Sequence, residues 1–325
     1  MSYHASNEQA RRYFRGRPHV GIPEGPIDSR AAWRGEDIRS AGAFRQPLSA
    51  AEVDELDDAL SHAAATGKPT IELEREDFPL PTMAPRIDQW RTELGEGRGF
   101  VLISGVPVDR WSEAETERFF WAFGQHLGTP GTQNPEGDLL GHVTDTGDAA
   151  RDPLVRLYRT PDNINYHCDG ADVVGLLCLK TAPSGGTSRI ASSTTVFNEL
   201  WAQNPEQARQ LFEPLRMDRR NEQATGEPPF IHMQPGCYDG TTLRTFYHSD
   251  YYRSVSRHVG ELPSHERELL DTYEDIAERP EIRLEMQFAP GDVQLLSNHT
   301  ILHARTAYQD GTAGKRHLLR LWLTL

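Results

Sequence analysis

A series of short apolar runs, separated by glycine-bearing turns, dominates the chain from residue 155 onward. The runs are VVGLLCLKTA, TSRIAS, IRLEMQFA, DVQLLSN and HLLRLWLTL, and the turns include APSGG, APGD and QDGTAG. Such runs predict strands, and closely spaced strands without regular alternation with helices favour an antiparallel sheet. We therefore expect a mainly β protein with a jelly-roll core, interrupted by helical insertions at about residues 194–211 and 264–277.

The first 95 residues differ from this strand-rich part, because Pro/Gly-rich stretches alternate there with one clear helix. The helix is LSAAEVDELDDALSHAAATG, with Ser49 at its N-cap and Gly67 at its end. GFVLISGVPV then predicts a buried strand, and an amphipathic helix follows from Ser112. We expect residues 1–95 to form a partly helical N-terminal extension packed on a core domain of residues 96–325.

The charge balance excludes several classes of partner. With 34 Lys and Arg against 48 Asp and Glu, the formal net charge is −14, which repels phosphate backbones and anionic membrane surfaces. The sequence contains no apolar run long enough to span a bilayer, and its polar start lacks the apolar stretch of a signal peptide. Three scattered cysteines do not make a disulfide framework. We expect a cytoplasmic protein that binds neither nucleic acid nor membrane.

The segment NINYHCDG places two metal-ligand types, His167 and Asp169, two positions apart. In extended backbone their side chains leave the same face, while Cys168 points away. A further histidine, His303 in NHTILHART, lies in the penultimate strand region, where a jelly-roll could bring it beside the first pair. Two histidines and one carboxylate with open positions form the facial triad that suits non-haem iron(II).

Two alternatives to this metal site stay open at the level of the residues. The HCD segment alone is also compatible with a hydrogen-bonded surface turn, because such pairs are frequent. His299 lies four residues before His303 and would share its face in a regular strand, so it is an alternative third ligand.

One arginine, Arg320, lies inside the apolar run HLLRLWLTL. A buried guanidinium needs a partner, because burying it unpaired costs several kcal/mol. A bound dicarboxylate would satisfy it with two parallel hydrogen bonds. An internal salt bridge is the other interpretation.

The motifs HCDG, SGGTS, NHTILH and RHLLR, in this order over roughly residues 98–325, resemble the taurine dioxygenase (TauD/TfdA) superfamily. The resemblance implies a double-stranded β-helix of the clavaminate synthase-like type. It implies Fe(II) held by His167, Asp169 and His303, and it favours His303 over His299 because the family's ligand precedes an arginine-containing stretch, here HART. It also implies that 2-oxoglutarate and O2 are cosubstrates.

In this family a late arginine binds the far carboxylate of 2-oxoglutarate, and a hydroxyl residue after a double glycine assists it. The resemblance assigns these roles to Arg320 and Ser188. Arg316 is the competitor because it shares strand parity with Arg320, but it adjoins Lys315 and Gly314, so we expect it to be exposed.

The implied reaction is oxidation of an unactivated carbon, in most cases hydroxylation, with release of succinate and CO2. The expected substrate is a small polar metabolite, such as an amino acid or another carboxylate, with Asn163 and Arg305 as candidate wall residues. Two other classes stay open: a cupin-like metal enzyme that does not use 2-oxoglutarate, and a catalytically silent binding protein on the same barrel. Self-association into a homo-oligomer is also compatible with the sequence.

Overall fold

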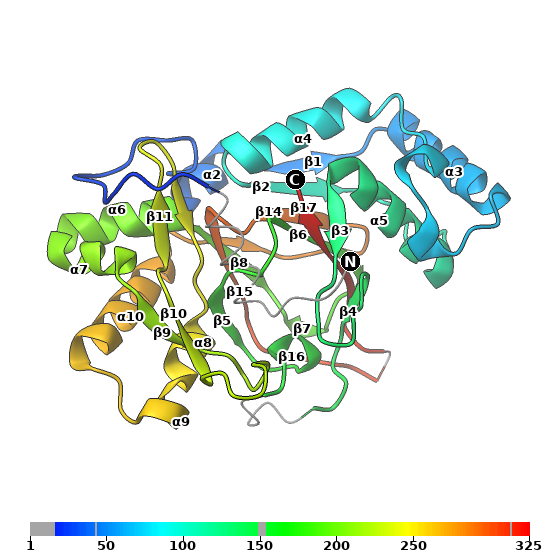
Figure 1. Cartoon of the computed structure of the whole chain (residues 1–325). Helices are drawn as coiled ribbons and strands as arrows, with labels where there is room; N and C mark the ends of the chain where they lie inside the picture. The colour runs from blue at the N-terminus through cyan, green and yellow to red at the C-terminus, as the bar shows by residue number, and fades with distance from the viewer. Residues whose placement is uncertain (1–16, 43, 149–153, 313) are drawn as a thin grey trace.

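Two β-sheets form the centre of the molecule in the computed structural model, which describes residues 17–42, 44–148, 154–312 and 314–325 (Figure 1). The larger sheet has the order β1-β2-β14-β6-β17-β3, with β4 also paired to β17. Its strands are β1 (Arg45–Pro47), β2 (Phe100–Ser104), β14 (Val293–Ser297), β6 (Val173–Lys180), β17 (His317–Thr324), β3 (Thr129–Gly131) and β4 (Gly141–Val143).

The smaller sheet has the order β13-β8-β15-β5 and is antiparallel throughout. Its strands are β13 (Leu284–Met286), β8 (Ser188–Ser192), β15 (Ile301–Arg305) and β5 (Ile164–His167). Successive strands of the chain alternate between the two sheets, as β13, β14, β15 and β17 do. The jelly-roll expected from the apolar runs is confirmed.

Alternate side chains of strand β17 pack into hydrophobic clusters on its two faces. Leu319, Leu321 and Leu323 pack with the helices outside the larger sheet. The alternate residues face the other way: Leu318 and Trp322 belong to clusters that include residues of the opposite sheet or the loops near it. Because side chains alternate along a strand, Arg320 lies on the inner face, between the sheets.

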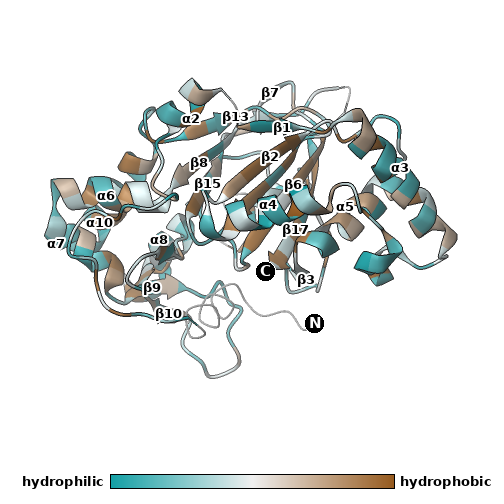
Figure 2. Ribbon diagram, turned by 90° about the horizontal axis from the view of Figure 1, so that it is seen from above, coloured by the Kyte–Doolittle hydropathy of each residue, from teal (hydrophilic) through white to brown (hydrophobic). Residues whose placement is uncertain are grey.

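Helices α4 (Ala84–Glu96) and α5 (Glu113–Leu127) cover the outer face of the larger sheet, and α3 (Ala50–Ala65) packs against α5 at one side (Figure 2). Ser49 and Ser112 each accept a hydrogen bond from the backbone N–H three residues on and form capping boxes with glutamates, as the sequence predicts for these helix starts. The N-terminal part also joins the sheet itself, because β1 pairs in parallel with β2.

Insertions cover the outer face of the smaller sheet. Their helices are α6 (Ser193–Gln203), α7 (Pro205–Arg209), α8 (Ser249–Ser254), α9 (Ser256–Val259) and α10 (Ser264–Ala277). Their strands form two pairs, β9 (Leu215–Asp218) with β10 (Phe230–Met233) and β11 (Gly236–Tyr238) with β12 (Leu243–Thr245). The helical insertion expected at about 194–211 is confirmed, with a break at Asn204 between α6 and α7. Asn204 is extended, as the residue before a proline tends to be, and its side chain caps α7.

The remaining elements are short: α2 (Gly35–Ala41), β7 (Ser184–Gly185), β16 (Tyr308–Gln309) and the 3-10 turns η1 (Thr70–Glu72), η2 (Arg75–Asp77), η3 (Leu157–Arg159) and η4 (Gln210–Phe212). Within the described ranges, no helix is both long enough and apolar enough to cross a bilayer. The three cysteines are buried and unpaired.

Candidate metal centre and the two pockets beside it

The proposed metal ligands meet where β5 lies beside β15. His303 is directly opposite His167 in this strand pair, and their ring centroids are 4.1 Å apart. Nε2 of His303 lies 3.6 Å from Oδ2 of Asp169, and Nε2 of His167 lies 3.9 Å from Oδ1. One donor atom from each residue lies within 4.8 Å of the others. Ligands about 2 Å from one metal ion are spaced in this way, so the donor set fits a metal.

Hydrogen bonds hold the side chain of His167 and the backbone of Asp169 in place. Nδ1 of His167 lies 2.9 Å from the carbonyl oxygen of Asn165, which can only accept, so Nδ1 carries the proton and Nε2 is free to bind a metal. The backbone N–H of Asp169 donates to Oδ1 of Asn298 at 3.0 Å. Cys168 points away from the centre, with its thiol 3.6 Å from the carbonyl oxygen of Ile301.

The electrostatics keep the centre in the protonation states that metal binding requires. Burial, followed by the nearby His303, lowers the pKa of His167 to about 3, so its imidazole is neutral near pH 7. Burial alone would raise the pKa of Asp169. The imidazole of His303 and the positive charge of Arg320 outweigh it and hold this pKa well below its usual value. The centre therefore offers the neutral Nε2 of His167 and the carboxylate of Asp169, beside the imidazole of His303.

His299, the alternative ligand, is engaged elsewhere. Its Nε2 lies 2.9 Å from Oδ1 of Asp172, and it is not part of the ligand cluster. A second group of ligand types, Glu113, His142 and His317, lies at the surface with two of its three members exposed. Neither pocket described below includes any of these three residues.

The first pocket, which we call the barrel pocket, is lined largely by strands of the two sheets. Its lining consists of Val143, Tyr158, Ile164, His167, Asp169, Val174, Leu176, Ser188, Phe288, Gln294, His303, Ala304, Arg305, Arg316, Leu318 and Arg320. It therefore extends from the metal centre between the sheets to a group of basic side chains. Ser188 Oγ is hydrogen-bonded to the side-chain amide of Gln294 at 3.0 Å.

Arg316 is buried in this pocket, so our expectation that it would be exposed is wrong. Only 4% of it is accessible, and its guanidinium lies 5.2 Å from the ring of Tyr308. Gly186 covers it closely: a Cβ there would lie 2.9 Å from Nε of Arg316. The flanking Lys315 and Gly314 misled the prediction, because residues distant in the sequence, Gly186 and Tyr308 among them, pack against the side chain.

The basic side chains of the barrel pocket have spare hydrogen-bonding capacity. Among the described residues, one terminal nitrogen of Arg316 and two nitrogens of Arg305 have no hydrogen-bond partner. The third nitrogen of Arg305 donates to the carbonyl oxygens of Thr160 and Asp162. Burial lowers the pKa of Arg305 to about 10 and also lowers that of Arg316, because no bonded carboxylate compensates the lost hydration.

Arg320 has a different environment from the one expected for an internal salt bridge. Its Nε donates to Oε1 of Gln133 at 2.7 Å, and Gln133 donates back to the carbonyl oxygen of Arg320 at 2.8 Å. The guanidinium lies 4.2 Å from the ring of Tyr158 and 5.2 Å from that of Trp322. Arg320 thus stands at the border of both pockets, since it lines each of them.

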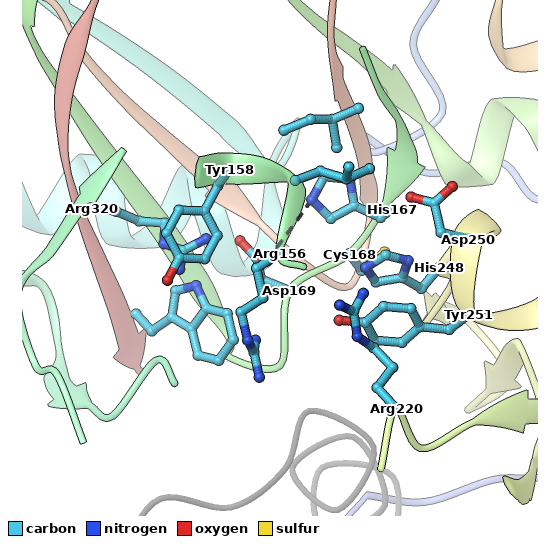
Figure 3. Close-up of a pocket in the computed structure, with 13 residues that line it drawn as sticks. Arg156, Tyr158, His167, Cys168, Asp169, Arg220, His248, Asp250, Tyr251 and Arg320 are labelled. Atoms are coloured by element: carbon cyan, nitrogen blue, oxygen red, sulfur yellow. Dashed lines mark ion pairs between the residues drawn. The ribbon is translucent and has the colours of Figure 1, made fainter. Parts of the chain in front are cut away.

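The second pocket, which we call the insertion pocket, lies on another side of the same centre (Figure 3). It shares Tyr158, Ile164, His167, Asp169 and Arg320 with the barrel pocket. Its other lining residues are Arg156, Leu157, Cys168, Arg220, His248, Asp250, Tyr251 and Trp322. No sequence pattern singles out Arg156, Arg220 or His248, because residues far apart in the chain build this pocket.

Asn163, expected in a pocket wall, lines neither pocket. Its side chain is exposed and donates to the side-chain oxygen of Asn165 at 2.9 Å. Arg305 lies in the barrel pocket, on the side of Ser188 and Arg316. Of the two substrate-wall residues that we expected from the sequence, only Arg305 therefore contacts a cavity beside the centre.

Comparison with known proteins settles the family. Residues 46–322 match the model of the family described as taurine catabolism dioxygenase TauD, TfdA family. The chain belongs to the TauD/TfdA family. Its members are Fe(II)- and 2-oxoglutarate-dependent dioxygenases, so the expected reaction class and the cofactors Fe(II), 2-oxoglutarate and O2 are confirmed.

Individual TauD/TfdA relatives align over most of the chain. It is 30% identical to FR-33289 synthase of Streptomyces rubellomurinus, over 94% of this chain and 92% of the relative. It is 28% identical to taurine hydroxylase-like protein SAT17 of Stachybotrys chartarum, over 91% and 79%. The crystal structure of the non-haem iron oxygenase OrfP with Fe, succinate and (3S)-hydroxy-L-Arg superposes with a TM-score of 0.64 at 16% identity, over 86% of this chain and 94% of that one, which confirms the fold.

Proposed function

We propose that His167, Asp169 and His303 hold the iron and that the chain hydroxylates a small polar molecule. The observation that supports this most is the meeting of the three donors where two pockets adjoin. A dioxygenase with two organic substrates needs space for both beside one metal, and the two pockets offer it. When bound, Fe(II) and 2-oxoglutarate supply the oxidising chemistry that transfers oxygen from O2 to a C–H bond and release succinate and CO2.

We infer that 2-oxoglutarate occupies the barrel pocket, with its keto acid end at the metal and its far carboxylate at Arg316. The sequence pattern favours Arg320 for this role. The surroundings support Arg316: it is buried, it has a nitrogen without a partner, and it shares the pocket with Ser188. Arg320 already donates to Gln133 and borders both pockets. Arg305 adds positive charge in the same pocket.

The residues of the chain contribute geometry, charge pairing and exclusion of water. A carboxylate between Arg316, Arg305 and Ser188 would satisfy the free guanidinium nitrogens and replace their lost hydration. Val174, Leu176 and Leu318 are apolar lining residues of the pocket and would contact the carbon chain of the acid. The hydrogen bond from Nδ1 of His167 to the carbonyl oxygen of Asn165 leaves Nε2 unprotonated and directed at the metal.

The comparisons support a small-molecule substrate. OrfP was crystallised with a hydroxylated arginine and succinate, and one relative is named as a taurine hydroxylase-like protein. By analogy, we propose a small polar metabolite as the substrate of this chain. A cytoplasmic location and self-association stay predictions from the sequence.

The test is turnover coupled to 2-oxoglutarate. Purified protein with Fe(II) should release succinate, and a panel of small metabolites should contain compounds that stimulate the release and gain one oxygen atom by mass spectrometry. The Asp169→Ala variant serves as the matched control and should release none. Oxidation of a metabolite without succinate would favour the cupin-like alternative. Failure to bind Fe(II) under anaerobic conditions would favour the silent binding protein.

A further inference from the structure

A second group of metal-ligand side chains lies outside both pockets, where α5, β4 and β17 meet. It consists of Glu113 at the start of α5, His142 in the middle of β4 and His317 at the start of β17. One donor atom from each residue lies within 4.8 Å of the others. His142 is opposite Leu319 in the strand pair, and Leu319 packs with the helices outside the larger sheet, so the group lies on that outer face.

The two imidazoles of this group face each other through one nitrogen each. Nδ1 of His142 lies 2.9 Å from Nε2 of His317, and the ring centroids are 5.1 Å apart. Two nitrogens that bind one Zn²⁺ tetrahedrally, each at about 2.0–2.1 Å, are about 3.3–3.4 Å apart. A movement of a few tenths of an ångström would therefore admit the ion. The His142 side chain is 43% exposed, which leaves it room to move.

Carboxylates lie near the outer nitrogens of the two rings. Oε1 of Glu113 lies 3.8 Å from Nδ1 of His317, and Oε1 of Glu117, one turn further along α5, lies 3.8 Å from Nε2 of His142. A carboxylate beside the second nitrogen of a metal-binding histidine favours the tautomer that leaves the first nitrogen free for the metal. The two carboxylates outnumber the ammonium group of Lys180, which lies opposite His317 on β6, so the charge here favours a cation.

The group lies directly behind the barrel pocket. Val143 follows His142 in the chain, and Leu318 follows His317. Val143 and Leu318 are opposite each other in the pair of β4 with β17, and both line the barrel pocket. Strand β4 has only three residues, so few backbone hydrogen bonds hold it to β17. An ion bound by His142, His317 and Glu113 would fasten β4 to its neighbours and stabilise this part of the pocket wall.

We propose that Glu113, His142 and His317 bind a second divalent transition-metal ion, Zn²⁺, which fastens β4 to α5 and β17 behind the barrel pocket. Two imidazoles and one carboxylate suit Zn²⁺, whereas Mg²⁺ and Ca²⁺ prefer sites made of oxygen atoms. Water completes the coordination, because the group is open to solvent. The site shares no residue with the proposed iron centre and does not depend on the proposed function.

The experiment counts the zinc ions that the full chain binds. Metal-free protein is dialysed to equilibrium against a range of Zn²⁺ concentrations, and the bound metal is measured by mass spectrometry. The unmodified chain should bind about two ions, because the iron centre also accepts Zn²⁺. The Asp169→Ala chain should keep about one ion, at the second site, and saturating Zn²⁺ should raise its thermal transition by a few degrees, since an ion that binds only the folded chain stabilises it.

Further variants in the Asp169→Ala chain assign the second ion to this group. His142→Ala and His317→Ala should each weaken Zn²⁺ binding at least about tenfold, because even the loss of an outer-shell partner costs about 10–100-fold in metal affinity. Glu113→Gln keeps the shape and removes the charge, so it should also weaken the ion about tenfold. The matched control is His265→Ala, which removes an exposed histidine near the start of α10 that belongs to neither group. It should leave the zinc affinity unchanged.

The outcomes separate this inference from the proposed function. If the Asp169→Ala chain binds no zinc, or if His142→Ala and His317→Ala bind it unchanged, the inference is wrong and the contact between the two rings is a hydrogen bond only. An unchanged affinity in Glu113→Gln would also contradict the three-ligand site. Succinate release by the unmodified chain with Fe(II) tests the proposed function independently, since that reaction needs no zinc. Folding of each variant is checked by circular dichroism without metal.

Discussion

The two pockets beside the metal centre are built from different parts of the fold. The barrel pocket is formed mainly by strands of the two sheets, β5, β6, β8, β14, β15 and β17. The insertion pocket shares β5 and β17 but is completed by the turn η3, the segment after β9 and the start of α8. A hydrogen-bonded ladder fixes side chains more rigidly than a loop or short helix does. This difference suggests that the rigid barrel pocket binds the cosubstrate and that the more adaptable insertion pocket recognises the substrate.

The arginines of the two pockets also differ, in their burial and in their partners. Arg305 and Arg316 are almost fully buried, at 6% and 4% exposure, and burial lowers the pKa of both. Arg156 and Arg220 are half-buried and engage Glu222 and Tyr251. A buried unpaired cation demands an anion more strongly than a half-buried one. We therefore expect larger effects from mutations in the barrel pocket than from mutations in the insertion pocket.

The largest effect should come from the centre that both pockets share. His303→Ala should reduce turnover at least about a thousandfold and weaken Fe(II) binding, because it removes one of three ligands. Equilibrium dialysis of Fe(II) under anaerobic conditions measures the binding. His299→Ala is the control and should keep its iron, since His299 pairs with Asp172. Iron loss in His299→Ala but not in His303→Ala would reverse the assignment.

The second effect distinguishes Arg316, which directly precedes β17, from Arg320, which lies within it. Arg316→Ala should weaken 2-oxoglutarate about 10²–10³-fold, because truncating one member of a buried ion pair typically costs about 2–5 kcal/mol and each 1.4 kcal/mol is about tenfold. Arg320→Ala should weaken it less than tenfold. The affinities are measured anaerobically with Fe(II) present. A large loss in Arg320→Ala with none in Arg316→Ala would restore the assignment made from the sequence.

The third effect should leave the barrel pocket unchanged. Asp218→Asn weakens the ion pair with Arg257 that fixes the end of β9 and the backbone of Arg220. We expect a loss of about 1–3 kcal/mol in the free energy of unfolding and increased hydrogen exchange of β9 and β10. The buried carboxylate accepts hydrogen bonds from Arg257, Ser254 and the backbone of Arg220, and an amide in its place cannot accept all of them. The affinity for 2-oxoglutarate should stay within about twofold. A comparable loss of 2-oxoglutarate affinity would show that the two pockets are not independent.

The pH dependence of the same carboxylate gives a related test. Burial alone would raise the pKa of Asp218, but the hydrogen bonds from Arg257 and from the backbone of Arg220 lower it below its usual value. A carboxylate with a lowered folded-state pKa stabilises the fold above its unfolded pKa of about 3.9, and this stability is lost as the pH falls through the folded-state value. The difference in stability between the unmodified chain and Asp218→Asn should therefore shrink below about pH 4. A difference that grew in acid would contradict this account.

The smallest effect should come from Asn163, which is exposed and lines neither pocket. Asn163→Ala should change succinate release and 2-oxoglutarate affinity by less than about twofold, because surface substitutions away from special features are nearly neutral. Steady-state succinate release measures this. A tenfold change would mean that the substrate reaches beyond the insertion pocket.

The sequence predicted the barrel well and the insertion pocket poorly, for physical reasons. Alternation along HLLRLWLTL places every second residue on the inner face, so the parity of Arg316 and Arg320 followed from local pattern alone. Arg316 is covered by residues far from it in the sequence, such as Gly186, more than a hundred residues away. Arg220 gains its place through contacts with Asp218, Val155 and Tyr251, and no period or propensity encodes such a set.

The most direct test of the division between the pockets is an anaerobic crystal structure of the chain with Fe(II) and 2-oxoglutarate. We predict iron between His167, Asp169 and His303, with the far carboxylate of 2-oxoglutarate in the barrel pocket within hydrogen-bonding distance of Arg316. The insertion pocket should hold no part of the acid. A far carboxylate bound by Arg220 or Arg156, with the barrel pocket filled by side chains or water, would contradict the account.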